Sequence, residues 1–158
     1  MPHPLHASAY QLAYPPTEVG DDSAVKDGRR RYTTSKLANV LTTYALARRL
    51  EDRGITVNAF DPGLMPGTGL ARDAGIVART LFATVAKALV MLPGVNTPKR
   101  SGANLARLVT DPDLAKTTGV YFAGTRAVRS SDDSYDVEVQ ETLYRDSLHI
   151  LEAIGRGG

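Results

Sequence analysis

A tyrosine and a lysine stand four residues apart in the stretch YTTSK, where Tyr32 precedes Lys36. If this segment is helical, the two side chains share a face and lie about one turn apart. A phenol is a poor acid–base group at neutral pH because its ordinary pKa is near ~10. A neighbouring ammonium favours the ionised phenolate, and such a pair could exchange a proton with a substrate hydroxyl or carbonyl. Two solvated residues on an ordinary helix are the alternative that this spacing leaves open.

A helix, a tight turn and a short strand are predicted around and after this pair. Apolar side chains recur at spacings of three and four and predict a helix over residues 31–53. Gly54 follows, in the place of the left-handed residue that ends many helices. The run ITVNAF, residues 55–60, predicts a short buried strand, which the tripeptide DPG at 61–63 ends. This order is half of a βαβ crossover, and open parallel sheets bind their ligands in the loops that follow such strands.

The rest of the chain predicts three more helices and one more strand. Residues 63–75 hold four glycines and a proline and predict a loop. A broadly apolar helix is predicted over 76–92, and another over 97–109, where Thr97 and Pro98 suit an N-cap and a first turn. GVYFAG, residues 119–124, predicts a short buried strand, and a last helix should begin near 131–133.

The run YTTSKLANVLTTYALARRLEDRGITVNAFDPGLMPGTGL, residues 32–70, resembles the short-chain dehydrogenase/reductase family in the order and spacing of its motifs. More narrowly, YTTSKLAN and DPGLMPGTGL are similar to the branch that holds protochlorophyllide reductases and retinol-dehydrogenase-like proteins. The later VNTPKRSGANLARLVTD and GVYFAG are similar to the same branch. The resemblance implies an α/β fold, the C-terminal part of a Rossmann-like doubly wound parallel sheet, over residues 31–158.

The resemblance also implies a reaction, the transfer of hydride between a nicotinamide cofactor and a small-molecule carbonyl or alcohol. Tyr32 would be the catalytic acid or base, with its phenol aimed at the substrate oxygen. Lys36 would favour the phenolate of Tyr32 and hydrogen-bond the nicotinamide ribose. The apolar helix over 76–92 would cover the substrate pocket, and core packing alone is the alternative for it.

The cofactor implied by the resemblance is NADP or NAD. Pro62, Gly63 and Leu64 would lie against the nicotinamide ring, although a plain turn is the alternative for Pro62 and Gly63. The family often places a phosphate-contacting Thr five residues after this proline, where the present chain has Gly67. Thr68, one residue later, is therefore the candidate for that contact.

Several parts of the family's site have no counterpart in the sequence. We find no strand with a glycine-rich phosphate turn before Tyr32, no ribose-reading residue, and no Ser that follows a strand-like run; Ser8 and Ser23 do not. A doubly wound sheet of this kind requires roughly 200 residues, and this chain has 158. We expect the N-terminal nucleotide-binding half to be missing, through a fragment, a misplaced start or a truncated gene, and the chain alone to have little or no activity.

A non-catalytic interaction or complementation half-domain is the alternative function. A half-domain would expose apolar faces, which tend to pair with a second copy or with a complementing chain. The possible partners are therefore a homo-oligomer or a chain that supplies the nucleotide half.

Composition excludes several other classes of protein. The 158 residues suit one domain, and the absence of cysteine excludes disulfides and thiolate catalysis. The net charge is only +2 and the arginines are scattered, which argues against nucleic-acid binding.

Without an N-terminal apolar run or a long uncharged stretch, we expect no signal peptide, no membrane span and a cytoplasmic protein. Residues 1–30 are proline-rich and predict an irregular arm, in which His3 and His6 fit a tail better than a metal site.

Overall fold

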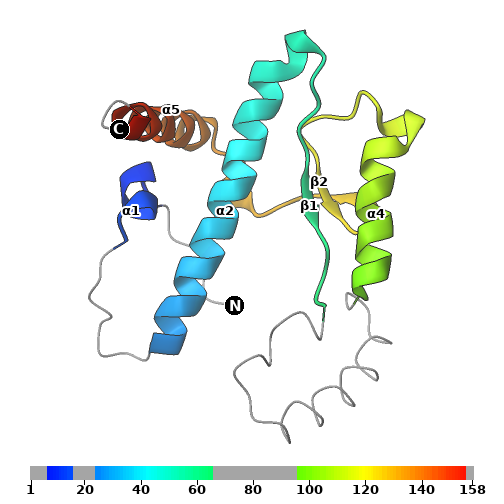
Figure 1. The fold of residues 1–158 in the computed structure, drawn as a ribbon, viewed down its shortest axis with the longest axis horizontal. Helices are drawn as coiled ribbons and strands as arrows, with labels where there is room; N and C mark the ends of the chain where they lie inside the picture. Colours follow the sequence, from blue (N-terminus) through cyan, green and yellow to red (C-terminus); the bar gives the residue numbers. More distant parts are fainter. Residues whose placement is uncertain (1–6, 16–23, 66–95, 156–158) are drawn as a thin grey trace, which may run out of the picture. The chain divides into compact units, whose positions relative to one another are not determined.

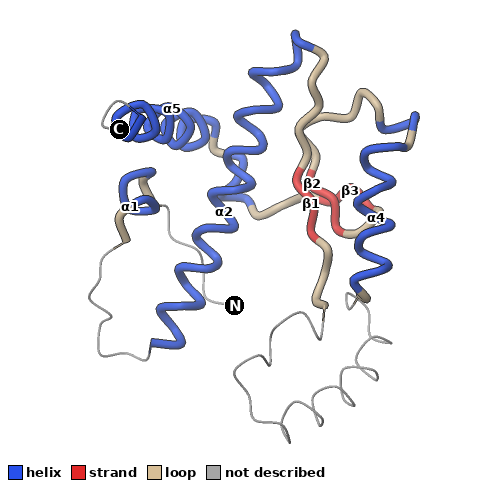
Figure 2. The backbone as a smooth tube through the Cα atoms, viewed as in Figure 1, coloured by secondary structure: helices blue, strands red, loops and turns tan. Residues whose placement is uncertain are grey.

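The computed structural model describes residues 7–15, 24–65 and 96–155 (Figure 1). The described part contains α-helices, short 3-10 turns and a small sheet (Figure 2). The α-helices are α1 (Ala9–Ala13), α2 (Ala24–Leu50), α4 (Pro98–Thr110) and α5 (Val137–Gly155), and the strands are β1 (Ala59–Asp61), β2 (Tyr121–Ala123) and β3 (Arg126–Val128). The predicted helix over 76–92 and most of the glycine-rich loop before it lie outside the described residues, as do His3 and His6.

The chain divides into two compact units, and the first is built on three helices. Helix α5 packs against both α2 and α1 (Figure 1). Their core is a cluster of Ala9, Leu37, Leu41 and Leu143, each at most 6% exposed. Leu37 and Leu41 are one turn apart on α2, so the spacing of three and four that predicted this helix also supplies its buried face.

The predicted helix over 31–53 is confirmed as far as Leu50, and its last residues tighten into a 3-10 turn, Glu51–Arg53. Gly54 then adopts the left-handed conformation, with φ of 68°, as predicted. The N-terminal bound was wrong, because α2 begins at Ala24 rather than near residue 31.

The N-terminal arm is not irregular throughout, contrary to the prediction for residues 1–30. Residues Ala9–Ala13 form α1, which starts with a capping box. The Ser8 hydroxyl accepts a hydrogen bond from the Gln11 amide, and the Gln11 side chain accepts one from the Ser8 amide. Ala9 is 4% exposed in the core cluster, so tertiary burial stabilises a helix too short to persist alone.

A polar contact ties the end of α2 to the start of α5. The Arg48 guanidinium donates to the Gln140 side chain and lies 2.8 Å from a Glu141 carboxylate oxygen. Arg49 donates to the other oxygen of Glu141. The hydrogen bond from Arg48, followed by that from Arg49, holds the pKa of Glu141 below its ordinary value. Gln140 is 2% exposed and donates to the Ser134 carbonyl, so its buried amide is satisfied.

The last helix begins later than predicted, at Val137 instead of 131–133. A 3-10 turn, Asp132–Tyr135, precedes it, and the extended backbone of Asp136 separates the two. The Asp136 carboxylate accepts a hydrogen bond from the Val139 amide at 3.1 Å, which is how an N-cap residue satisfies a free donor at a helix start.

The second unit contains most of the sheet, whose strand order is β1-β2-β3. Strands β2 and β3 form an antiparallel hairpin in which Phe122 is opposite Ala127, and Gly124 turns the chain with φ of 61°. The strand predicted over 119–124 is thus confirmed at Tyr121–Ala123, where Phe122 is 3% exposed. Sequence reasoning missed β3, whose residues are all exposed.

Strand β1 is shorter and less buried than the predicted strand over 55–60. Only Ala59–Asp61 form it, and all three are half-buried. Before it, the Val57 amide and the Val120 amide donate to the side chains of Thr118 and Asn58. The Gly119 amide donates to the Val57 carbonyl, so backbone pairing before Ala59 is interrupted by these side-chain acceptors and the regular strand begins at Ala59.

Helix α4 belongs to the second unit and confirms the helix predicted over 97–109. The Thr97 hydroxyl accepts a hydrogen bond from the Arg100 amide at 3.2 Å, and Pro98 occupies the first turn. Its neighbour in the fold is the β2–β3 turn, since a Cβ on Gly124 would lie 3.5 Å from the Asn104 side chain. Helices with a small three-stranded sheet are compatible with the predicted α/β class.

Candidate functional site

Tyr32 and Lys36 lie one turn apart on α2, as their spacing predicted. The Lys36 ammonium nitrogen is 5.3 Å from the centre of the Tyr32 ring, within range of a cation–π contact. Both residues are outside the buried face of the helix, and Tyr32 is 58% exposed. The ammonium and the aromatic ring are therefore paired at a surface that a small molecule can reach.

The polar atoms of this pair are available to a ligand. Neither the Tyr32 hydroxyl nor the Lys36 ammonium makes a hydrogen bond or an ion pair within the described part of the chain. The nearby hydroxyls are occupied differently, because Thr33 donates to the Arg30 carbonyl and Ser35 donates to the Tyr32 carbonyl. A phenol and an ammonium thus remain as the free donors on this stretch of α2.

Pro62 and Gly63 form a defined turn directly after β1 in the second unit. The Gly63 amide donates to the Asp61 carboxylate at 2.8 Å, and Gly63 has φ of 76°. An L side chain rarely adopts that conformation, so this glycine is required by the backbone. Leu64 follows with 55% of its surface exposed, and its carbonyl accepts from the Asn96 amide at 2.8 Å.

The predicted site residues fall in separate parts of the structure. Tyr32 and Lys36 belong to the first unit, Pro62, Gly63 and Leu64 to the second, and Thr68 lies outside the described residues. The structure therefore describes the pair and the turn each by itself.

Sequence reasoning missed the residues that hold the turn. Asp61 had a local signal, because an Asp before Pro-Gly often bonds a backbone amide two residues on. Its second carboxylate oxygen accepts from the Tyr121 hydroxyl at 3.3 Å, which no local signal indicates. The contacts from Asn96 and Ser101 to the Pro62 carbonyl span more than thirty residues and are likewise invisible in the sequence.

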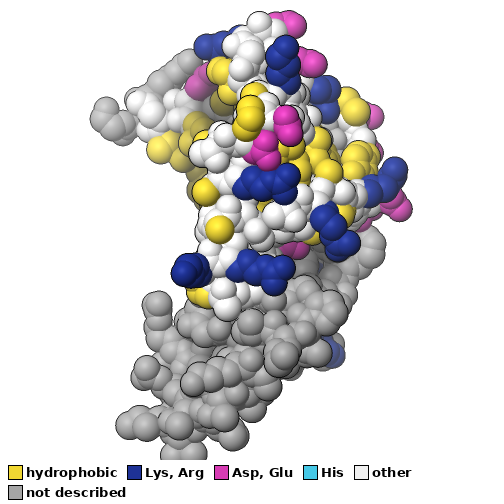
Figure 3. Space-filling view, turned by 90° about the vertical axis from the view of Figure 1, so that its right-hand side faces the viewer, with side chains coloured by type: hydrophobic (Ala, Val, Ile, Leu, Met, Phe, Trp, Pro, Cys, Tyr) yellow, Lys and Arg dark blue, Asp and Glu magenta, His cyan; other side chains and the backbone are white. Residues whose placement is uncertain are grey.

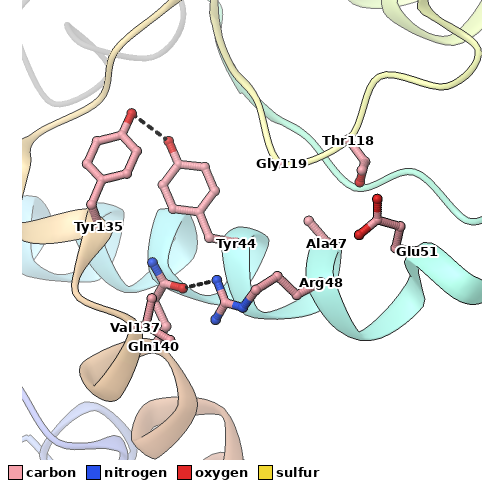
Figure 4. Close-up of a pocket in the computed structure, with 9 residues that line it drawn as sticks. All are labelled: Tyr44, Ala47, Arg48, Glu51, Thr118, Gly119, Tyr135, Val137 and Gln140. Carbon is pink, nitrogen blue, oxygen red and sulfur yellow. Dashed lines mark hydrogen bonds between the residues drawn. The ribbon is translucent and has the colours of Figure 1, made fainter.

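A pocket of about 330 Å³ lies in the first unit, away from Tyr32 (Figure 4). Tyr44 lines it, and at 1.5 Å per residue Tyr44 is about 18 Å along the helix from Tyr32. Polar side chains that line the pocket are bonded within the protein: Tyr44 to Ser130 at 2.6 Å, and Arg48 to Gln140. Its lining residues are Tyr44, Ala47, Arg48, Glu51, Thr118, Gly119, Tyr135, Val137 and Gln140.

Two tyrosines form the aromatic wall of this pocket. Tyr44 and Tyr135 stack with ring centres 5.3 Å apart. The Tyr44 hydroxyl donates to the Tyr135 hydroxyl at 3.4 Å, a bond that is dashed in Figure 4. Burial raises the pKa of Tyr44, so its phenol stays protonated at neutral pH. This tyrosine is a packing residue bonded to Ser130, and its surroundings do not favour proton transfer.

Metal-binding clusters and membrane-spanning helices are absent from the described residues. They contain no cluster of three or more His, Asp or Glu side chains that could hold a metal ion. No helix among them is both long enough and apolar enough to cross a membrane. On the face seen in Figure 3, Lys and Arg side chains are interspersed with Asp, Glu and hydrophobic ones, so that view shows no continuous basic stripe on the described surface.

Comparison with known proteins finds relatives that are named as dehydrogenases or reductases. No family model matches the chain. It is 33% identical over 128 residues to "Short-chain dehydrogenase TIC 32 A, chloroplastic" of Brassica napus, which covers 80% of this chain and 38% of that protein. It is 34% identical over 120 residues to "Retinol dehydrogenase 13" of Homo sapiens, with 76% and 36% covered. It is 35% identical over 116 residues to "Protochlorophyllide reductase, chloroplastic" of Pisum sativum, with 73% and 28% covered.

The chain spans less than two fifths of the length of these relatives, while they match about three quarters or more of the chain. They include both kinds of protein that the motifs around Tyr32 and Pro62 resemble. The resemblance read from the sequence is therefore confirmed, and the chain is a relative of the short-chain dehydrogenase/reductase family in its protochlorophyllide reductase and retinol dehydrogenase-like branch.

Proposed function

We propose that this chain carries the proton-transfer and nicotinamide-contacting residues of an NAD(P)-dependent oxidoreductase that interconverts a small-molecule carbonyl and an alcohol. The relatives named above support an oxidoreductase in general. The observation that carries the finer proposal is the exposed Tyr32 phenol, free of partners in the described chain, with the Lys36 ammonium 5.3 Å from its ring.

The chemistry of these donors fits a nicotinamide nucleotide and its substrate. Tyr32 is 58% exposed and can donate its proton to a carbonyl oxygen, or accept one from an alcohol as the phenolate. Lys36 places its ammonium 5.3 Å from the centre of the Tyr32 ring, and this ammonium can donate a hydrogen bond to a ribose hydroxyl. When bound, the nicotinamide group supplies or accepts the hydride, and the chain's own residues bind, orient and move the proton.

Pro62, Gly63 and Leu64 are proposed to contact the nicotinamide ring. A Pro ring and a side-chain-free Gly offer an apolar, close-packing surface, and Leu64 adds an exposed apolar side chain. Thr68 stays a predicted phosphate contact. The choice between NAD and NADP depends on a ribose-reading residue that we do not find in this sequence. The glycine-rich turn that would bind the pyrophosphate is not found either. We therefore propose little or no turnover by the chain alone.

Replacing Tyr32 by Phe tests the catalytic role. Tyr32→Phe removes the hydroxyl but keeps the ring under Lys36, and whatever carbonyl reduction the chain carries out with NADPH or NADH should fall roughly 10²- to 10⁴-fold, to the background of the assay. Tyr14→Phe is the matched control, because Tyr14 is also exposed, at 53%, and should leave turnover unchanged. A wild-type rate above background that Tyr32→Phe leaves unchanged would remove Tyr32 from the mechanism.

The cofactor role is tested on the chain as it stands. Reduced nicotinamide mononucleotide is the probe, since it is the half of the cofactor that these residues would contact. When this mononucleotide is added to the chain, the amide NMR signals of residues near Lys36 and Gly63 should shift. A spectrum that does not change up to millimolar probe would overturn the proposed cofactor contact.

An interaction or complementation half-domain is the second candidate, and α5 favours it. Leu148, Leu151 and Ile154 recur at three-residue steps and are 40%, 64% and 62% exposed. Light scattering of the purified chain should then show association that Leu151→Lys abolishes. A monodisperse monomer that binds no second chain would count against this candidate.

A cytoplasmic location stays a prediction, since two of the relatives named above are described as chloroplastic.

A further inference from the structure

The carbonyl of Pro62 is held by two side chains from a distant part of the chain. The Asn96 side-chain amide and the Ser101 hydroxyl each donate to it at 2.8 Å. Asn96 also binds the other side of the turn, because its backbone amide donates to the Leu64 carbonyl at 2.8 Å. Ser101 is 5% exposed, so its hydrogen bond is shielded from water.

The same turn is held from below by the sheet. One oxygen of the Asp61 carboxylate accepts from the Gly63 amide at 2.8 Å, and the other accepts from the Tyr121 hydroxyl at 3.3 Å. The Asp61 carbonyl accepts from the Gly124 amide at 3.0 Å. The residues from β1 to Leu64 are thus bonded to β2, to the β2–β3 turn and to the start of α4.

Ser101 differs from five other hydroxyl residues of the described helices. A Ser or Thr inside a helix ordinarily bonds a carbonyl three or four residues back in its own helix. Helical hydroxyls here that do so are those of Thr33, Ser35, Thr43, Thr110 and Ser147. Ser101 instead reaches a carbonyl 39 residues away, which is the one between Pro62 and Gly63.

We infer that Asn96 and Ser101 are positioning residues that lock the Pro62–Gly63 turn and so set where the nicotinamide ring can lie. This inference rests on the proposed function, and it adds a role to residues outside the motifs that suggested that function. A turn with φ of 76° at Gly63 has other accessible conformations, because glycine is permissive. Two donors on one carbonyl select a single orientation of the Pro62–Gly63 peptide, and a prearranged turn costs the ligand less ordering entropy.

The test uses two variants and one matched control in the full chain. Ser101→Ala deletes one donor, and Asn96→Asp keeps nearly the same shape but presents a carboxylate that cannot donate. Thr110→Ala is the control, since it deletes a hydroxyl of the same helix that bonds a carbonyl of its own helix, that of Ala106. If Ser101→Ala does not fold, Asn96→Asp provides the same measurement.

Two quantities are measured, hydrogen exchange at the Gly63 amide and the dissociation constant of reduced nicotinamide mononucleotide. Loss of one hydrogen bond should speed the exchange and weaken binding by roughly two- to tenfold each, whereas Thr110→Ala changes neither. A purely structural role would lower stability but leave the dissociation constant of the folded protein unchanged.

The outcomes separate the inference from the function on which it rests. Gly63 exchange that both variants leave unaltered overturns the inference, as does altered exchange with unaltered binding. No binding by the wild-type chain overturns the proposed function and, with it, the assigned role of the turn. Weaker binding by both variants, with the control unchanged, supports both.

Discussion

Two left-handed glycines of this chain offer a matched test of how backbone conformation serves stability and binding. Gly54 ends the helical segment after α2 with φ of 68°, and Gly63 forms the turn after β1 with φ of 76°. We predict that Gly54→Ala and Gly63→Ala both destabilise the fold, and that only Gly63→Ala weakens binding of reduced nicotinamide mononucleotide.

The magnitude follows from the geometry at Gly54. A Cβ added there meets nothing within 4 Å, so no steric clash with neighbours contributes. What remains is the cost of a left-handed L residue, about 1–2 kcal/mol. For a chain of 158 residues this corresponds to a fall in melting temperature of roughly 2–8 °C. Gly54→Asn should cost less, because Asn tolerates the left-handed region better than Ala.

Urea unfolding followed by circular dichroism measures the stabilities, and NMR titration measures binding. Gly63→Ala should show the larger dissociation constant because it shifts the turn proposed to contact the ring, while Gly54→Ala binds as wild type does. A neutral Gly54→Ala would refute the backbone argument. Unchanged binding by a folded Gly63→Ala would refute the assignment of the turn.

Two further predictions concern the packing of α2 on α5. Because hydrogen bonds from Arg48 and then Arg49 lower the pKa of Glu141, its contribution to stability is present above the ordinary value of 4.5 and is lost as pH falls through the lowered pKa. Denaturation curves of the wild type should show a loss of about 0.2–1 kcal/mol per ion pair over this pH range, and Glu141→Gln should not show this loss. The same pH dependence in the wild type and in Glu141→Gln would contradict the prediction. Leu143 belongs to the buried cluster, so Leu143→Ala should lower the free energy of unfolding in urea by about 2–5 kcal/mol. Leu151 is 64% exposed, so Leu151→Ala should change it by less than about 0.5 kcal/mol. Equal effects would mean that α5 does not bury the face that carries Leu143.

Local rules predicted the helices well and the strands less well. The periodic apolar residues of α2, the left-handed Gly54 and the N-cap Thr97 each depend on neighbours within four residues, and all three are confirmed. The bounds of β1 depend instead on which groups lie across from it. The Asn58 side chain takes the Val120 amide, so pairing begins later than the run of β-branched residues suggested.

Burial decided the helix that sequence reasoning missed. A five-residue segment has no stability of its own, and α1 forms where Ala9 packs with Leu41 and Leu143. Nothing local in the N-terminal stretch reports that these partners, one of them more than 130 residues away, are close in space.

The sequence by itself determined the pair Tyr32 and Lys36, because a spacing of four on a helix places two side chains on one face whatever the surroundings. It also determined the turn at Pro62 and Gly63, through residues whose backbone preferences are intrinsic. Only the tertiary structure decided what holds that turn. Hydrogen bonds from Ser101 and its neighbour Asn96 to one carbonyl need exact positions of segments far apart in the chain, and packing of the whole unit sets those positions.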